Sequence, residues 1–553
     1  MSSIFGILNT GRSGIYANQT GLSVTGNNIA NVNTPGYSRQ RVNLSGQLLG
    51  GVRVTSIQRM RDEFLAQQLN LNNARMEGAS TLALNLSQLE GVLGDGQDSP
   101  LSSALRAFHH ALQDLTNQPG GVTERETLRS SARQLASSFQ GMTTQIGTIR
   151  EQLDLQVQQQ VGRVNQLASQ IADLNRRLGE TQGAASEAQQ RGDRNALLDQ
   201  RDQLVGQLSQ MVPVRTMNHQ NGLITIFAGD HVLVEDVNHH DLNLRVNQSN
   251  NGYHEVVGMD MAGQYYSLRE QFDSGSLGSL LRVRDEHARQ LIDDIDRLAA
   301  SIVRDINAHH RLGQGMDGIA GRDFFEPVHT SAWARWTNNG RAEVTATNVL
   351  DPSALTFQDY EIRFTDSSHY DIVNTTTDTT VASGNNYTSG NPIALAGMSV
   401  TISDGAGAPV AGDVFQVNSY AGTTGAMELS APIQNDPSAI AAGLTSATGD
   451  NRNALDMAAL FDTARMGLPP TQRYEQYFDS LRLNLGMATE RAQQKRDEEQ
   501  IAQQQTQALA DSVSGVSLDE EATEIIKYQR AFQASSRMIS VTDELLQTLL
   551  QTI

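Results

Sequence analysis

Paired histidines are the first residues in this sequence that could do chemistry, because imidazole rings bind metals and transfer protons. Three such pairs occur, at His109-His110, His239-His240 and His309-His310. Two ligands on one helix share a metal at i,i+3 or i,i+4 spacing, whereas adjacent residues face different directions. The sequence also contains no His-Glu-x-x-His motif. We therefore expect no metal site at these pairs.

Acidic, glycine-rich and serine-containing segments also lack the spacing of known sites. Asp317-Gly318 and Asp323 stand in a glycine-rich loop, but the repeated acids and closing glutamate of a calcium loop are missing. The glycine stretches 91–96 and 405–407 match neither phosphate-binding pattern, and no serine lies in a Gly-x-Ser-x-Gly motif. The sequence therefore predicts no catalytic residue, no cofactor and no enzymatic activity.

Two charged segments have simpler explanations than chemistry. Arg191-Gly192-Asp193 can be an integrin-binding motif, but a solvated loop over residues 181–194 accounts for so short a tripeptide. In the segment 195–205, the aspartates and arginines fit a helix start with i,i+3 pairing rather than acid–base catalysis.

The composition excludes further classes of protein. A net charge of −20 disfavours binding to nucleic acid, which needs clustered Lys and Arg. The absence of cysteine excludes disulfides, zinc thiolate sites and cysteine nucleophiles. The first residues lack the basic start and apolar core of a cleaved signal peptide, and no run approaches the ~20 apolar residues needed for membrane insertion.

The 553 residues suggest three or four domains, and the low aromatic content of 5% suggests elongated, aliphatic cores.

The elements that organise these domains lie at the two chain ends. Apolar residues recur there at intervals of seven, which predicts helices that each carry one narrow apolar seam. The seam residues are Leu8, Ile15, Leu22 and Ile29 near the start, and Leu518, Ile525, Phe532, Ile539, Leu546 and Ile553 near the end. Such helices need a partner, so we expect the two ends to form one coiled-coil stem. The alternative is two unrelated amphipathic helices on separate domains.

A polar string follows the first seam. Thr34-Pro35-Gly36 predicts the end of the helix, because the residue before a proline leaves the helical region and Pro-Gly favours a turn. The asparagines before it can satisfy free carbonyl groups at a helix end. The whole string consists of Asn27, Asn28, Ile29, Ala30, Asn31, Val32, Asn33, Thr34, Pro35, Gly36 and Tyr37.

This string resembles the N-terminal motif of flagellar rod, hook and hook-associated proteins. The segment 195–205, and the segment 514–521 that leads into the terminal heptads, are similar to the FlgK family of hook-associated proteins. The three resemblances occur in the order of that family.

Between the ends, proline-free stretches with 3.6-residue periodicity predict long helices, including one from Leu280 to about His310. Strand-like alternation appears at 52–59 and from Leu223 to about Ser267. From about 324 to 432 the sequence is rich in Thr, Ser, Gly and Asn, with strands such as 360–364 and 414–417. The predicted fold class is therefore α+β and multidomain, with a discontinuous terminal coiled coil, a long helical bundle with small β elements, and an inserted sandwich- or barrel-like β domain. The expected boundaries are 1–45 plus 514–553, 46–322 plus 433–513, and 323–432.

The resemblance implies a structural protein of the bacterial flagellum that joins hook and filament. It implies export by the flagellar type III apparatus without a cleaved signal, and assembly as a ring through the terminal helices. The implied partners are further copies of the chain, the hook protein, the next hook-associated protein, and an export chaperone on the C-terminal helix. Two other hypotheses remain. The chain could be an exported coiled-coil adhesin or effector with a β binding head, or an enzyme with its site in 324–432.

Overall fold

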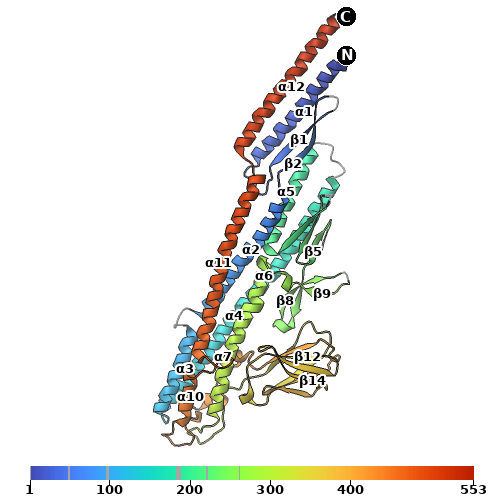
Figure 1. The fold of residues 1–553 in the computed structure, drawn as a ribbon. Coiled ribbons are helices and arrows are strands. Elements are labelled where there is room, and N and C mark those ends of the chain that lie inside the picture. The colour runs from blue at the N-terminus through green and yellow to red at the C-terminus, as the bar shows by residue number, and fades with distance from the viewer. Residues whose placement is uncertain are drawn as a thin grey trace.

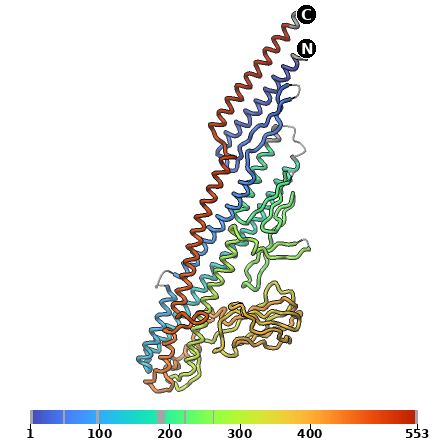
Figure 2. Tube along the Cα trace, viewed as in Figure 1, coloured from blue at the N-terminus to red at the C-terminus, as the bar shows by residue number. Residues whose placement is uncertain are grey.

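The protein is elongated, and both chain ends lie at the same pole of the molecule (Figure 1). The computed structural model describes residues 2–47, 50–94, 99–181, 188–219, 222–260 and 262–552. A terminal helix pair occupies one pole, a helical stem extends from it, and a β domain lies beside the other end of the stem (Figures 1 and 2).

The stem is a bundle of long helices around one hydrophobic core, which continues into the β domain. Its longest helix, α4, has 60 residues and is therefore roughly 90 Å long. The helices of the stem are α2 (Glu63–Leu93), α3 (Pro100–Asn117), α4 (Val122–Thr181), α5 (Ala188–Met211), α6 (Gly275–Arg282), α7 (Ala288–His310), α10 (Arg452–Asp462) and α11 (Tyr474–Ser514).

Local chemistry sets several of these boundaries. The carboxylate of Asp62 accepts hydrogen bonds from the backbone N–H groups of Phe64 and Leu65, which caps α2. Pro100 occupies the first turn of α3, where its missing N–H costs nothing. A π-helical turn, Val283–His287, joins α6 to α7. Arg284 in this turn is fully buried and forms ion pairs with Asp285 at 2.7 Å and Asp154 at 2.6 Å.

Two small antiparallel sheets lie beside the stem and contact α4. The first contains β3 (Val214–Asn218), β4 (Ile224–Ala228), β5 (His231–Glu235) and β6 (Asn238–His239). The second contains β7 (Asn243–Asn247), β8 (Tyr253–Met259) and β9 (Tyr265–Ser267), with a 3-10 turn at Gln248–Asn250.

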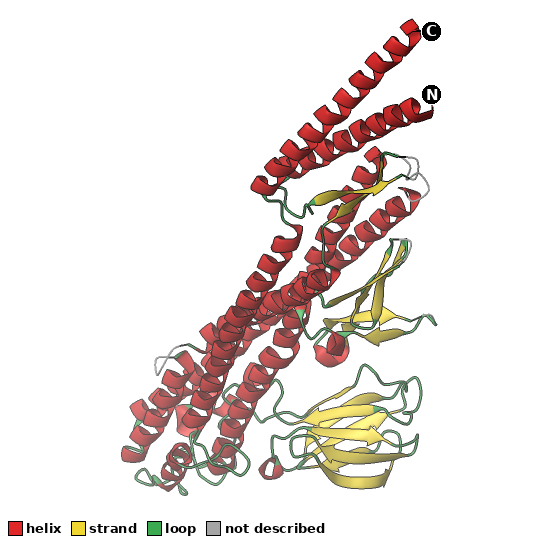
Figure 3. Ribbon diagram, turned by 45° about the horizontal axis from the view of Figure 1, so that its top comes forward, coloured by secondary structure: helices red, strands yellow, loops and turns green. Residues whose placement is uncertain are grey.

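The β domain is a sandwich of two antiparallel sheets (Figure 3). Phe364 and Phe415 of the five-stranded sheet and Val400 and Ile402 of the three-stranded sheet are each at most 2% exposed, as expected for two sheets that pack face to face. No sheet closes into a barrel within the described residues. The five-stranded sheet has the order β10 (Ser331–Ala334), β17 (Val414–Asn418), β12 (Tyr360–Phe364), β13 (His369–Asn374) and β14 (Thr379–Asn386). The three-stranded sheet has the order β11 (Glu343–Val349), β16 (Met398–Ser403) and β15 (Pro392–Leu395). The short helices α8 (Thr423–Ala426) and α9 (Ala431–Asn435) follow.

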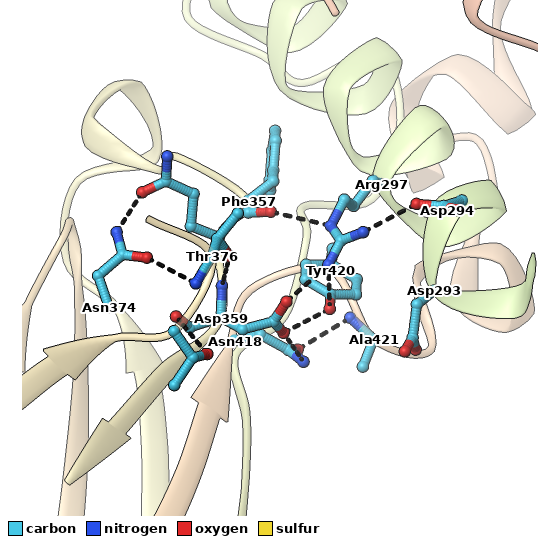
Figure 4. Close-up of polar contacts among 12 residues, drawn as sticks. Asp293, Asp294, Arg297, Phe357, Asp359, Asn374, Thr376, Asn418, Tyr420 and Ala421 are labelled. Carbon is cyan, nitrogen blue, oxygen red and sulfur yellow. Dashed lines mark hydrogen bonds and ion pairs between the residues drawn. The ribbon is translucent and has the colours of Figure 1, made fainter. Parts of the chain in front are cut away.

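Arg297 on α7 attaches this domain to the stem (Figure 4). Its guanidinium donates to Asp294 on the same helix and to Asp359, the phenol of Tyr420 and the carbonyl of Phe357 in the β domain. It also lies 4.4 Å from the centre of the Tyr420 ring. This side chain is only partly exposed, and hydrogen bonds from a shielded guanidinium are strong and directional. The contacts therefore fix the orientation of the β domain relative to α7.

The terminal helix pair consists of α1 (Ser2–Ala30) and α12 (Leu518–Thr552), which lie side by side (Figures 1 and 2). A hairpin of β1 (Gln40–Gly46) and β2 (Val52–Arg59) packs against α1. The hairpin spans the domain boundary that the sequence suggested at residues 45 and 46.

The predicted fold class is confirmed, and so are the strands at 52–59, 360–364 and 414–417 and the presence of strands between Leu223 and Ser267. Two local predictions were wrong. Residues 188–194, including Arg191-Gly192-Asp193, belong to helix α5 rather than to a loop. Consequently the segment 195–205 lies inside a helix and does not start one. The helix expected from Leu280 to about His310 is present; it begins five residues earlier, at Gly275, and contains the π turn in which Arg284 is buried.

Candidate assembly site at the terminal helices

The most buried positions of α12 form a heptad register that includes polar residues. Glu521 and Thr542 are each only 2% exposed, although both are polar. Each lies three residues after a predicted seam position, Leu518 or Ile539. In a heptad repeat, that spacing is the second core position. Along the face of α12 that contacts α1, apolar seam residues therefore alternate with smaller or polar residues at the second heptad position.

Glycines on α1 receive the side chains of α12. A Cβ atom added at Gly11 would lie 2.7 Å from Ile539, and one added at Gly14 would lie 2.7 Å from the hydroxyl of Ser535. At Gly21 it would lie 2.5 Å from the ring of Tyr528. Contacts this short do not occur, so a side chain at Gly11 or Gly21 would force its neighbour on α12 to shift, whereas at Gly14 only the Ser535 hydroxyl would have to rotate.

The predicted seam of α1 lies one residue beyond this contact line. Leu8, Ile15, Leu22 and Ile29 are half-buried. Ile15 and Leu22 directly follow Gly14 and Gly21, so they flank the contact rather than fill its centre. On α12, the half-buried seam residues are Ile525, Phe532, Ile539 and Leu546. Leu518 is 53% exposed at the helix start, and Ile553 lies outside the described residues.

A second face of α1 packs on the hairpin. Ala17 and Val24 form a small buried cluster with Val42 of β1 and Val54 of β2. These residues are separate from the contact line to α12. As a result α1 lies between α12 and the hairpin, and both neighbours fix its position.

Asn28 ties the end of α1 to both neighbours, and only 1% of its surface is exposed. Its amide nitrogen donates to the carbonyl of Gln40 and to the carboxylate of Glu521, both at 2.9 Å. Its amide oxygen accepts from the phenol of Tyr37 at 2.8 Å and from the backbone N–H of Gln40 at 3.0 Å. We call Asn28, Tyr37, Arg39, Gln40 and Glu521 the latch.

Charge reinforces the latch. The guanidinium of Arg39 donates to Glu521 at 2.7 Å and to Glu520 at 2.6 Å. Burial tends to lower the pKa of Arg39, but the hydrogen bond and charge of Glu521 outweigh it and raise the pKa. Burial, and then the charges of Asp199 and Glu521, raise the pKa of Tyr37 to about 12, so its phenol stays protonated as a donor.

Carboxylates on α5 connect the latch to the stem. Asp199 accepts from Arg59 of β2 at 2.7 Å and from the backbone N–H of Ser38 at 3.3 Å. Asp202 accepts from Arg59 at 2.8 Å and also from Arg61. The predicted i,i+3 pairing within 195–205 was therefore wrong. These aspartates are largely buried and need cationic partners, which come from the segment 59–61.

Most other motif residues shape the turn after α1. The side-chain amide of Asn31 donates to the carbonyl of Asn27 at 3.0 Å, and its oxygen accepts from the hydroxyl of Thr34 at 3.1 Å. Gly36 has a φ of +81°, which favours glycine. Ile29, Asn31 and Val32 are half-buried, and the exposed members are Asn27, Ala30, Asn33, Thr34, Pro35 and Gly36.

The sequence contained signals for some residues that we missed. Glu521 and Thr542 fall on the second heptad position, but a search for apolar residues alone does not select polar ones there. Gly14 and Gly21 are seven residues apart, which is the period of the seam itself. The partnership of Asp199 with Arg59 has no local signal, because 140 residues separate the two.

The histidine pairs do not meet as metal ligands. His310 is fully buried, with one ring nitrogen on the carbonyl of Arg322 and the other on the N–H of Ala441. Its neighbour His309 does not join it in a ligand set. In the part of the chain that the structure describes, no group of three metal-ligating side chains converges. No helix within those residues has the length and apolarity to cross a membrane.

Three family models match the chain. The flagellar hook-associated protein FlgK helical domain matches residues 86–325, which form much of the stem. The flagellar basal body rod FlgEFG protein C-terminal model matches 507–552, which includes α12. The flagella basal body rod protein model matches 8–37, which covers α1 and the polar string.

Curated relatives match over almost the whole length. Flagellar hook-associated protein 1 of Salmonella typhimurium is 26% identical over 562 residues, covering 98% of this chain and 99% of the relative. The protein of the same name from Bacillus subtilis is 26% identical over 586 residues, covering 99% and 98%. Among solved structures, the flagellar hook junction protein FlgK from Burkholderia pseudomallei aligns with a TM-score of 0.69 at 20% identity, covering 81% of this chain and 100% of that one.

Proposed function

We propose, from the membership of this chain in the FlgK family of flagellar hook-associated proteins, that it is a structural component of the bacterial flagellum at the junction between hook and filament. The observation that carries the proposal is the terminal helix pair within a chain that aligns with hook-associated protein 1 from end to end. The pair provides the surface through which subunits assemble.

Exposed apolar side chains on the pair support assembly through this region. Phe5 and Tyr16 on α1 are 62% and 57% exposed, and Ile526 and Leu545 on α12 are each 51% exposed. Covering such apolar side chains with another protein surface removes them from water and lowers the free energy. The half-buried seam residues add to this unsatisfied surface. We propose that neighbouring copies in a ring cover both, with residues 1–45 and 514–553 as the assembling unit.

The proposed partners at the two faces of the ring are the hook protein and the next hook-associated protein. The chain is exported to the flagellum by the type III apparatus without a cleaved signal, and an export chaperone holds α12 beforehand. The chaperone would cover the same apolar residues that later contact neighbouring copies. A chain without cysteine suits passage in an unfolded state, because no disulfide can form on the way.

A deletion strain tests the function. Without this chain we expect loss of motility and shedding of filament protein into the medium, visible by electron microscopy and by blotting of culture supernatants. The wild-type gene should restore attached filaments. Intact filaments on the deletion strain would contradict the junction role.

A matched pair of variants tests the assembly surface. Leu545→Glu places a charge on the exposed face of α12, so it should fail to restore attached filaments even where blotting of the culture medium shows that the variant has been exported. Leu483→Glu changes a leucine on the stem helix α11 that is also more than half exposed (64%), and this variant should restore attached filaments. Normal complementation by Leu545→Glu would show that this face is not used.

A further inference from the structure

A cleft of about 500 Å³ lies between the stem and the β domain, away from the terminal helices. Its walls come from α4, α7 and the loop before β8 on one side, and from β10 and the segment after β17 on the other. Its volume lies in the range of about 300–1,000 Å³ that is usual for small-molecule sites.

The cleft contains a buried cation without a counter-charge. Arg150 on α4 is only 3% exposed. Its Nε donates to the carbonyl of Arg284 at 3.0 Å and one Nη donates to the amide oxygen of Asn250 at 2.8 Å. Both acceptors are neutral. Among the residues that the structure describes, no carboxylate lies within ion-pair distance of Arg150, and its other Nη makes no hydrogen bond.

Arg284, which is next to it, shows what such a residue usually requires. Arg284 is completely buried and holds two carboxylates, those of Asp285 and Asp154. A buried charge costs several kcal/mol without a partner. Burial lowers the pKa of Arg150; the nearby Tyr253 and Asp285 partly offset this effect, and the charges of Arg289 and Arg284 lower the pKa further.

The other walls provide aromatic surface and hydrogen-bonding groups. The Arg150 guanidinium lies 4.6 Å from the centre of the Tyr253 ring, and Trp333 of β10 lines the opposite wall. Arg289 on α7 adds a second guanidinium, held only loosely by Asp293 at 3.8 Å. Asp296 does not compete for it, because its carboxylate already accepts from Gly422 and Thr424.

We propose that this cleft binds a small carboxylated saccharide, with the carboxylate against Arg150 and Arg289. An arginine fork matches the two oxygens of a carboxylate. Tyr253 and Trp333 provide flat apolar surface for the faces of a sugar ring, and Asp293 accepts from its hydroxyl groups. This site is independent of the junction role and uses none of the terminal residues.

Calorimetric titration of the full-length protein tests the proposal with glucuronate as the probe. Glucose has a similar ring without the carboxylate, and acetate has the carboxylate without the ring. We expect glucuronate to bind and both comparison compounds to bind at least tenfold more weakly. Equal binding of glucose and glucuronate, or no binding of glucuronate at millimolar concentration, would overturn the proposal. Equal binding of acetate would overturn the saccharide class.

Variants locate the site. Arg150→Gln should weaken binding of glucuronate at least tenfold, with circular dichroism to check that the stem is folded. Arg289→Gln changes a residue at the rim that is 39% exposed and should also weaken it at least tenfold, so it decides the matter if the first variant unfolds. Arg163→Gln, on the exposed side of α4, should bind like the wild type. Unchanged binding by Arg289→Gln would place any ligand elsewhere.

Discussion

Asn28 uses all of its hydrogen-bonding capacity in a place that excludes water. An amide can donate and accept at once without carrying charge, and Asn28 does both toward Tyr37, Gln40 and Glu521. Neither a carboxylate nor an aliphatic side chain of similar size could serve these partners. This explains chemically why an asparagine stands at this position of the motif.

Replacing Asn28 with Asp should release the latch. The new carboxylate cannot donate to the carbonyl of Gln40 and would face the carboxylate of Glu521. We expect a loss of about 2 kcal/mol or more in local stability, since buried groups lose their partners. Hydrogen exchange of the first turns of α12 measures it. Asn27→Asp, at an exposed neighbour, is the control, and equal exchange in the two variants would refute the role of Asn28.

His310 predicts an acid-sensitive contact at the far end of the stem. The N–H of Ala441 donates to one ring nitrogen, so the other carries the proton and donates to the carbonyl of Arg322. Burial lowers the pKa of His310 to about 4. Because this value is below the unfolded pKa of about 6.5, the contribution to stability is complete above pH 6.5 and is lost as the pH falls toward 4.

The expected loss is about 3 kcal/mol between pH 7 and pH 4 from this residue alone. Urea unfolding of wild type and His310→Gln at both values measures it. The variant should be less stable at pH 7 but should lose less stability on acidification. His239→Gln, at an exposed histidine, should follow the wild type. Parallel pH profiles for His310→Gln and wild type would rule out this contribution.

At the scale of elements, α1 and α12 combine an apolar seam with glycines. The seven-residue period was visible in the sequence, and both helices occur where it predicted them. The period did not reveal which residue of each heptad lies at the centre of the contact between α1 and α12. Hydrophobic counting selects leucine and isoleucine, whereas Gly11, Gly14 and Gly21 lie in the contact because the helices approach closely.

Two glycines on α1 make a matched test of this packing. Gly21→Ala would place a methyl group 2.5 Å from the Tyr528 ring, whereas Gly26→Ala would meet nothing within 4 Å. We expect Gly21→Ala to speed hydrogen exchange in α12 near Tyr528. Gly26→Ala should stabilise α1 by up to about 1 kcal/mol, since alanine is the better helix former. The same exchange rates in both variants would mean that α12 does not need the space at Gly21.

At the scale of the whole molecule, changes in periodicity predicted the order of helical and β regions, because alternation of two and of 3.6 residues reflects local geometry. The contacts that join these regions were not predictable. Arg59 with Asp199, Asn28 with Glu521, and Arg297 with Asp359 join residues that lie 140, 493 and 62 positions apart. No pattern within a helical or strand window reports such pairs. The β sandwich was predictable as a class because the alternation in its strands is local. Its contact with α7 through Arg297 and Asp359 was not predictable, because it joins residues that are distant in the sequence.

The distribution of burial along the molecule predicts unequal stability. In the stem, α4 buries a nearly continuous apolar stripe, including Phe139, Ile146 and Val157, each at 0% exposure. In the terminal pair the apolar seam is only half-buried, and the most buried positions of α12 are polar. Since apolar burial contributes about 25 cal/mol per Å², the pair gains much less per residue than the stem. Local opening should therefore begin at the terminal pair.

Hydrogen exchange on the free subunit and on assembled junctions tests this gradient. Amides in residues 5–30 and 518–546 should exchange much faster than those of α4 in the free subunit. If copies assemble through this pair as proposed, these amides should slow markedly after assembly, because neighbouring copies would then cover Phe5, Ile526 and Leu545. The β domain, far from the pair, should exchange alike in both states and is the internal control. If the terminal helices of the free subunit were protected as strongly as α4, they would already be buried enough without neighbours, and their exposed apolar side chains would need another explanation.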